Sequence, residues 1–170
     1  MNKNDIAAAI EPQINQGLTI IALSFLMGVG FMYGIAYFMH LSAEIPPADA
    51  FNDGHLARTL AQLTLLYFAV SIPLGRFLFK KMAKPNAGIT DPYLVVNNIR
   101  TGMLVQLAII EGAALLGAVS FLMGALDGYT HVNSLMWGTF LPLAYMAFHI
   151  ILMLPPKNYI LKMYEEHFPG

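Results

Sequence analysis

Cysteine is absent from this 170-residue chain, which excludes disulfide bonds and every reaction that depends on a thiol. Charged side chains are scarce as well. They make up 11% of the residues, against roughly 25% in an average soluble domain. Hydrophobic residues, in contrast, account for 57%. This composition excludes an ordinary soluble domain and indicates a protein that lies in a membrane.

The charged residues are also segregated, which leaves four long apolar segments. These are residues 18–39, 56–79, 101–124 and 135–154. Each has about 20–24 residues, the length of helix that crosses a hydrocarbon core of about 30 Å. Continuous apolar runs of this kind cross lipid as helices. The sequence therefore predicts an all-α fold in one domain, a four-helix transmembrane bundle with the lipid bilayer as its surroundings.

The basic residues indicate how this bundle is oriented. They are Lys3, Arg58, Arg76, Lys80, Lys81, Lys84, Arg100, Lys157 and Lys162. All but Arg58 lie on the side of the two termini and the second connector, whereas residues 40–55 and 125–133 contain acidic residues and no basic one. The positive-inside rule thus predicts an N-in/C-in multi-pass protein of the bacterial inner membrane. Topology accounts for the basic residues, so no nucleic-acid partner is expected.

Glu111 is the only acidic residue in the middle of an apolar segment. It lies about 15 Å from the start of the third segment, near the middle of the bilayer. An ionised carboxylate there costs several kcal/mol, so the group must be protonated, paired or bound to a cation. Three interpretations stay open: a hydrogen bond that holds two helices together, a proton or cation site, and a contact with a partner subunit.

His149 on the fourth segment is the best candidate partner for Glu111, and Tyr145 lies one turn away on the same helix face. A cluster of these three side chains predicts either a proton relay or a structural hydrogen bond. Gln106 is a further candidate for the proton or cation site, although it points to a different face of the third helix.

Three more histidines, His40, His55 and His131, gather at the outer surface by topology. They are weak metal candidates, because no pair of them has a spacing typical of metal ligands. Haem is not expected either, since His149 has no second histidine at its depth. We therefore predict no metal and no cofactor.

Small residues predict where helices approach one another closely. Gly30 and Gly34 form such a pair of small residues, four positions apart, on the first segment. On the third segment the corresponding pairs are Ala108 with Gly112 and Ala113 with Gly117. The third helix is accordingly predicted to be central in the bundle.

Flanking segments and prolines add local predictions. Residues 4–10 and 157–167 are amphipathic enough to lie at the membrane surface, the second of them with Tyr159, Leu161 and Tyr164 toward the membrane. Pro73 and Pro142 are expected to kink the second and fourth helices.

Two resemblances follow from these motifs. Residues 106–119, which contain Glu111, resemble the carboxylate helix of the rotary ATPase proteolipid, subunit c. That resemblance implies that Glu111 binds a proton or sodium ion, although the second segment lacks the family's glycine ladder. The whole chain resembles a family of small uncharacterised bacterial four-helix membrane proteins. The matching motifs are Pro73, Phe79-Lys80-Lys81, Glu111-Gly112 and Pro156-Lys157.

The expected function is that of an integral membrane protein without catalytic activity, because the sequence offers no pairing of a nucleophile with a base. In the leading interpretation Glu111 binds a proton or cation, as in a proteolipid-like or small transport component, either in one chain or in a homo-oligomer. The alternative is an accessory subunit of a larger membrane complex, with other membrane subunits as partners.

Overall fold

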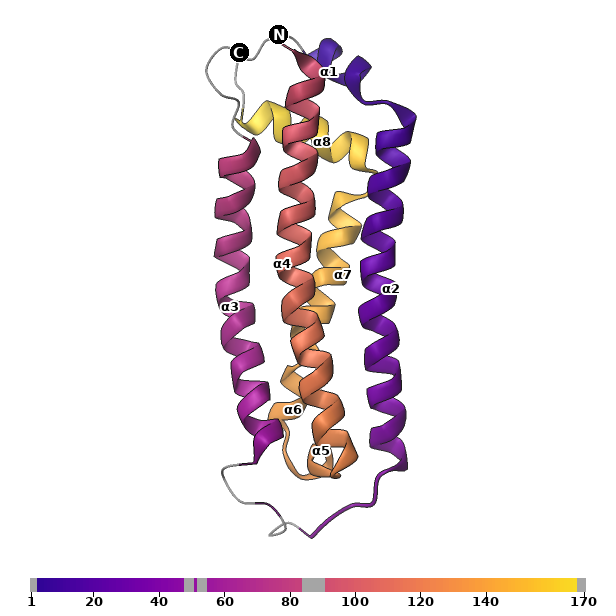
Figure 1. Ribbon diagram of the computed structural model, residues 1–170, viewed down its shortest axis with the longest axis vertical. Helices are drawn as coiled ribbons and strands as arrows, with labels where there is room; N and C mark the ends of the chain where they lie inside the picture. The colour runs from indigo at the N-terminus through magenta and orange to yellow at the C-terminus, as the bar shows by residue number, and fades with distance from the viewer. Residues whose placement is uncertain (1–2, 48–50, 52–54, 84–90, 168–170) are drawn as a thin grey trace.

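The computed structural model describes residues 3–47, 51, 55–83 and 91–167, and this part of the chain contains helices and no strand (Figure 1). The helices are α1 (Lys3–Ala9), α2 (Pro12–Ser42), α3 (Leu56–Ala83), α4 (Pro92–Leu126), α5 (Tyr129–Val132), α6 (Leu135–Gly138), α7 (Leu141–Met153) and α8 (Pro156–His167). The predicted all-α class is confirmed for these residues. We call the end that holds α1 and α8 the terminal end and the end that holds α5 and α6 the loop end.

Four of these helical stretches are long and apolar enough to cross a membrane: Pro12–Ser42, Leu56–Ala83, Pro92–Leu126 and Leu135–Met153. They coincide with the four predicted segments, but α2 and α4 begin well before residues 18 and 101. The reason lies in their first turns. Proline at the start of a helix needs no N–H partner, and Asp91 caps α4 by accepting a hydrogen bond of 2.9 Å from the backbone N–H of Tyr93.

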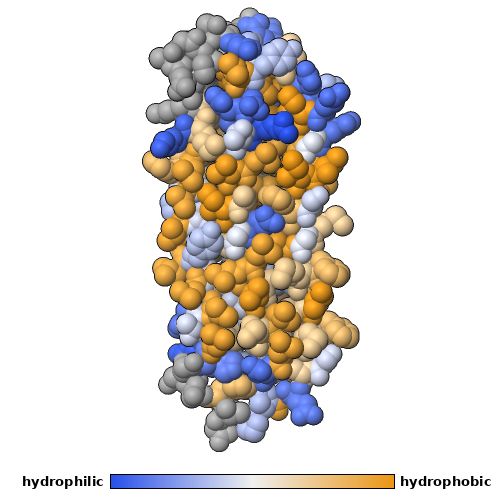
Figure 2. All heavy atoms as spheres, viewed as in Figure 1, coloured by the Kyte–Doolittle hydropathy of each residue, from blue (hydrophilic) through white to orange (hydrophobic). Residues whose placement is uncertain are grey.

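The outside of the bundle is apolar over its middle and polar at both ends (Figure 2). Large hydrophobic side chains are exposed there, among them Met27 at 74% and Phe31 at 71%. Contiguous apolar surface on this scale is unfavourable in water and suits a bilayer. The chain is therefore compatible with a multi-pass integral membrane protein.

Helix α4 is central, because α2, α3 and α7 all pack against it (Figure 1). One face of α4 consists of residues that recur at helical spacing and are all buried: Gly102, Gln106, Ala113, Gly117, Ser120 and Gly124. The main core joins other α4 residues, among them Leu107, Ile110 and Phe121, to Val29 and Tyr33 of α2, Ala61 of α3 and Met146 of α7. Two hydroxyls join α3 to α4, since Thr64 Oγ1 and Ser120 Oγ lie 2.9 Å apart.

The fourth span is broken just before Pro142, where the sequence predicts a kink. Helix α6 ends at Gly138 and α7 begins at Leu141. Pro142 has no N–H to give to the carbonyl four residues earlier. The chain turns instead through hydrogen bonds that span three residues rather than four. They run from the N–H of Thr139 to Met136 O and from the N–H of Phe140 to Trp137 O, both at 3.2 Å. The Thr139 carbonyl then accepts a hydrogen bond from the Tyr33 hydroxyl of α2.

Helices α1 and α8 cover the terminal end and share a second core with α3 and α4. Ile6 of α1 and Ile160 of α8 are completely buried in it, and an ion pair of 2.5 Å joins Lys3 to Glu165. The sequence predicts that Tyr164 is available to the membrane, whereas the structure buries it against the protein. Helix α8 packs its apolar face on the bundle because α1 and α4 offer it an apolar surface.

Candidate functional site

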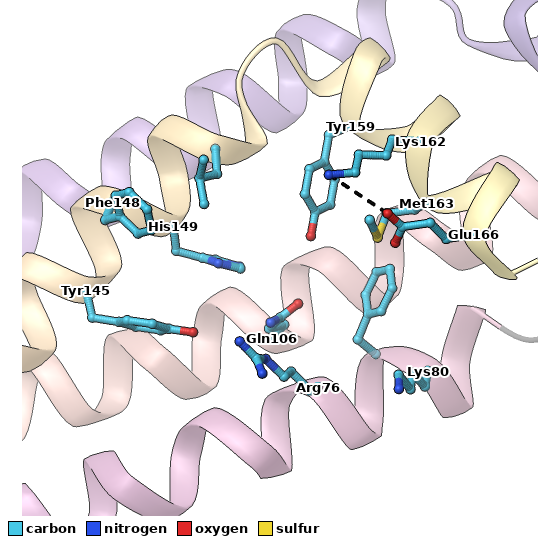
Figure 3. A pocket seen from close by; sticks show the side chains of 12 residues that line it. Arg76, Lys80, Gln106, Tyr145, Phe148, His149, Tyr159, Lys162, Met163 and Glu166 are labelled. Atoms are coloured by element: carbon cyan, nitrogen blue, oxygen red, sulfur yellow. Dashed lines mark ion pairs between the residues drawn. The ribbon is translucent and has the colours of Figure 1, made fainter.

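A cavity of about 390 Å³ lies at the terminal end, between α3, α4, α7 and α8 (Figure 3). It is lined by Arg76, Phe79, Lys80, Gln106, Tyr145, Phe148, His149, Leu152, Tyr159, Lys162, Met163 and Glu166. Three of the residues predicted for a polar site meet here: Gln106, Tyr145 and His149. Charged and polar groups that converge in one concave space make it the best candidate for a binding site in the described part of the chain.

Helix geometry places Gln106, Tyr145 and His149 at the cavity. Gln106 is buried on the central face of α4, where α3 comes close because Gly75 has no side chain: a Cβ on Gly75 would lie 3.2 Å from Gln106 Cγ. Tyr145 and His149 are one turn apart on α7. Their rings are nearly parallel, with an interplanar angle of 12° and centroids 6.0 Å apart.

The charges around the cavity do not balance. Lys162 and Glu166 form an ion pair of 3.8 Å within α8, drawn as a dashed line in Figure 3. Arg76 and Lys80 come from α3, and neither has an acidic partner within ion-pair distance among the described residues. The cavity therefore has an excess of positive charge.

His149 adds an unsatisfied polar atom. Its Nε2 is out of contact with solvent and makes no hydrogen bond with any described residue. Buried polar atoms are nearly always hydrogen-bonded, and leaving one without a partner costs about 1–3 kcal/mol. The ring thus lines the cavity with free capacity for one hydrogen bond to a ligand.

Tyr159 of α8 directs its hydroxyl into the same space (Figure 3). Burial raises the pKa of this phenol, and the nearby charge of Glu166 raises it further. The group is consequently a neutral hydrogen-bond donor throughout the physiological pH range.

Glu111 is not part of the cavity. It lies half-exposed on α4 and forms no hydrogen bond or ion pair with any described residue. The predicted cluster with His149 and Tyr145 is therefore not formed within the chain. The reason is the helix period: five residues separate Glu111 from Gln106, which turns the two side chains about 140° apart on α4.

The small residues differ in what they contact. A Cβ at Gly112 would lie 3.3 Å from the Tyr67 hydroxyl, and one at Gly117 only 2.6 Å from the Thr139 carbonyl oxygen. Ala113 is completely buried, whereas Ala108 is exposed. Nothing lies within 4 Å of a Cβ at Gly30 or Gly34. The close approach predicted for these two glycines is absent within the chain, because α2 turns Val29 and Tyr33 toward α4 instead.

The three weak metal candidates lie at the loop end and take part in other contacts. His40 Nδ1 is 2.7 Å from Thr130 Oγ1, and His131 Nε2 is 3.0 Å from the His40 carbonyl oxygen. His55 stacks on Tyr129 and lies 3.5 Å from Asp127. No group of three metal-ligating side chains occurs in the described ranges. These histidines connect the ends of helices.

Sequence reasoning missed five polar cavity residues as site residues: Arg76, Lys80, Tyr159, Lys162 and Glu166. The available signal was the amphipathic pattern of residues 157–167, but nothing in that pattern shows that this helix folds over α4 and α7. Comparison with protein-family models, curated proteins and solved structures finds no match for the chain.

Proposed function

We propose that the protein is a non-catalytic membrane subunit in which Glu111 pairs with a polar group on a partner helix. One observation carries the proposal: Glu111 is half-exposed on a membrane-spanning helix and has no partner among the described residues. It lies about 20 Å from the Leu126 end of α4, well inside a hydrocarbon core of about 30 Å. A carboxylate that faces lipid at this depth is strongly unfavourable, whereas a partner helix would supply the missing hydrogen bond or charge.

The surface around Glu111 supports such a contact. Ala108 precedes it by one turn and is exposed, so a second helix could approach the backbone closely there. Glu111 is followed by Gly112, which also adds no bulk. The partner is a second copy of the chain or another membrane subunit, as the sequence predicts.

A second candidate function is the binding of a proton or cation by Glu111, as the resemblance to the proteolipid helix implies. Its support is the same half-exposed position, from which the carboxyl group could exchange a proton. A cation would need several oxygen ligands, and the described residues bring no second acidic side chain to Glu111. The geometry thus favours protonation over a bound metal ion when Glu111 acts alone.

The orientation that we propose is N-in/C-in, in a bacterial inner membrane. Its support is the distribution of basic residues. Arg76, Lys80, Lys81, Arg100, Lys157 and Lys162 all belong to the terminal half of the bundle, and Arg58 alone lies near the loop end.

A crosslinking experiment tests the proposed contact. A photoreactive residue at Ala108 is expected to give a crosslinked product in native membranes, whose mass tells a second copy from a different subunit. Glu111→Gln should reduce this product several-fold, because the amide cannot form an ion pair. Glu44→Gln is the matched control, since it removes an exposed carboxylate from the loop end. An unchanged product in Glu111→Gln contradicts a role for the carboxylate in the contact.

Labelling with a hydrophobic carbodiimide, which reacts with a protonated carboxyl group, separates the two functions. Glu111 in a subunit contact is shielded in membranes and becomes reactive after dissociation in detergent. If Glu111 reacts in intact membranes and the reaction slows as pH rises, the carboxyl group is a free proton site and the subunit proposal is wrong. Protection by added sodium would identify a cation site.

A further inference from the structure

We propose that the cavity between α3, α4, α7 and α8 binds the phosphate group of an anionic phospholipid, which enters from the bilayer between α3 and α7. The cavity lies on a different part of the bundle from Glu111, so this inference stands independently of the proposed subunit contact. The argument rests on the polar groups of the cavity, its excess charge and its apolar entrance.

The polar groups match a phosphate. Arg76 supplies a guanidinium, whose planar set of N–H donors fits phosphate oxygens in pairs. Gln106 has an amide whose N–H₂ makes no hydrogen bond with any described residue. His149 Nε2 is equally unpartnered and can donate when its ring carries the proton there. In Figure 3 the side chains of Arg76, Gln106 and His149 point toward one another from three helices.

The charge favours an anion over a zwitterion. Lys162 and Glu166 neutralise each other, which leaves Arg76 and Lys80 as the net charge of the cavity wall. The Tyr159 hydroxyl adds a neutral donor on the side of α8. A phosphodiester with a neutral headgroup brings one negative charge to this set, whereas a choline headgroup would bring a cation close to Arg76.

The entrance decides between a lipid and a free phosphate ion. Helices α3 and α7 both pack on α4 and meet where the rings of Phe68 and Tyr145 lie 5.5 Å apart. On the terminal side of this contact, exposed side chains of α7 line the cavity and give it a lateral opening. The residues at this opening are apolar and exposed: Phe148 at 57% and Leu152 at 55% belong to α7. Just outside, the exposed Phe77 continues the apolar surface on α3. Acyl chains can lie along these side chains while the phosphate stays inside.

The depth is that of a lipid headgroup. Arg76 lies seven positions before Ala83, the last residue of α3, or about 10 Å inward from the terminal end. The polar interfacial layers of a bilayer lie at this level, beside the hydrocarbon core of about 30 Å. Helix α8 covers the cavity on the side of the terminal end, so a lateral path through the membrane is the direct one for a lipid.

The test measures lipid retention by native mass spectrometry. The full chain is placed in nanodiscs of phosphatidylcholine with a minor fraction of phosphatidylglycerol, then released and weighed with its bound lipids. We expect the protein to retain phosphatidylglycerol in preference to phosphatidylcholine. Arg76→Gln should lower this preference about tenfold, which corresponds to about 1.4 kcal/mol. Lys81→Gln is the matched control, because it removes the same charge from an exposed position of α3 outside the cavity.

A second variant tests whether net charge alone explains the retention of phosphatidylglycerol. Gln106→Leu deletes the amide without changing charge, and it should also lower the retention of phosphatidylglycerol. Circular dichroism of both variants checks that the helices are intact. Equal retention of both lipids by the unaltered protein, or equal losses in Arg76→Gln and Lys81→Gln, would overturn the proposal. Displacement of the bound phosphatidylglycerol by millimolar inorganic phosphate would show that the cavity takes free phosphate rather than a lipid, which contradicts the proposal.

Discussion

Adding one methyl group at Gly117 should destabilise the bundle more than adding it at any other spanning glycine near the middle of the membrane. Gly117 of α4 lies against the point where the Tyr33 hydroxyl of α2 donates to the Thr139 carbonyl of α7. A Cβ at this position would come to 2.6 Å from the Thr139 oxygen and 3.3 Å from Thr64 Cγ2. The new methyl group would force α2 and α7 away from α4 and separate the Tyr33 donor from its acceptor.

The expected cost of Gly117→Ala follows from these two effects. A buried hydrogen bond that is lost with its carbonyl left unpaired costs about 1–3 kcal/mol. Overpacking of a tight core costs a further 1–3 kcal/mol, approximately. The sum is about 2–6 kcal/mol, which is a large share of the stability of a small protein.

Unfolding in mixed detergent–dodecyl sulfate micelles, followed by circular dichroism, measures this cost. Gly34→Ala is the matched control, because nothing lies within 4 Å of its added Cβ. That substitution should be neutral or stabilising by up to about 1 kcal/mol through its helix propensity. If the two variants unfold together, the contact of α4 with α2 and α7 at Gly117 does not exist as described.

A double-mutant cycle isolates the hydrogen bond. In Tyr33→Phe the donor is already lost, so the added methyl group at Gly117 should cost less than it does in the unaltered protein. The two substitutions are expected to be less than additive by about 1 kcal/mol, the range found for residues in contact. Strict additivity would show that the methyl group acts elsewhere.

Two further predictions concern orientation and pH. The chain has no cysteine, so single introduced cysteines report its orientation. An Ile45→Cys variant at the loop end should react with a membrane-impermeant thiol reagent in intact cells, and a Lys81→Cys variant should not. Labelling of Lys81→Cys alone would reverse the proposed orientation. Burial, and then Glu166, raises the pKa of Tyr159 in the folded protein above its ordinary value of 10.0. The folded state thus holds this proton longer, so stability is full below about pH 10 and falls as pH rises from there. Melting temperatures between pH 9 and 11 should fall less for Tyr159→Phe than for the control Tyr93→Phe, an exposed position; equal slopes would contradict the shift.

The class of the fold could be read from composition, because only helices satisfy their backbone groups along a continuous apolar run. The centrality of α4 was also predictable from its small residues. The lack of a close contact at Gly30 and Gly34 could not be predicted, since small residues permit close packing but do not determine which face of α2 turns inward. Val29 and Tyr33 occupy that face, and only the arrangement of three helices reveals it.

The cavity was predictable in part for a similar reason. Gln106, Tyr145 and His149 stood out because they are polar within apolar segments. Arg76 looked like a topology signal, and Tyr159 like a residue for the membrane surface. Arg76 and Tyr159 line the same cavity only because of the path that α8 takes after Pro155 and Pro156. That path depends on tertiary contacts, which local propensity does not determine.

The second core has a consequence for biosynthesis. It joins Ile6, close to the beginning of the chain, to Ile160, which is synthesised some 150 residues later. At about 5–20 residues per second, α1 therefore waits roughly ten seconds or more for its packing partner. During that interval the apolar face of α1 lacks α8, and α4 with the lipid headgroups covers what remains. Synthesis of α8 is thus the step that closes the terminal end, and a chain that stops before α8 should leave this surface exposed to quality-control proteases.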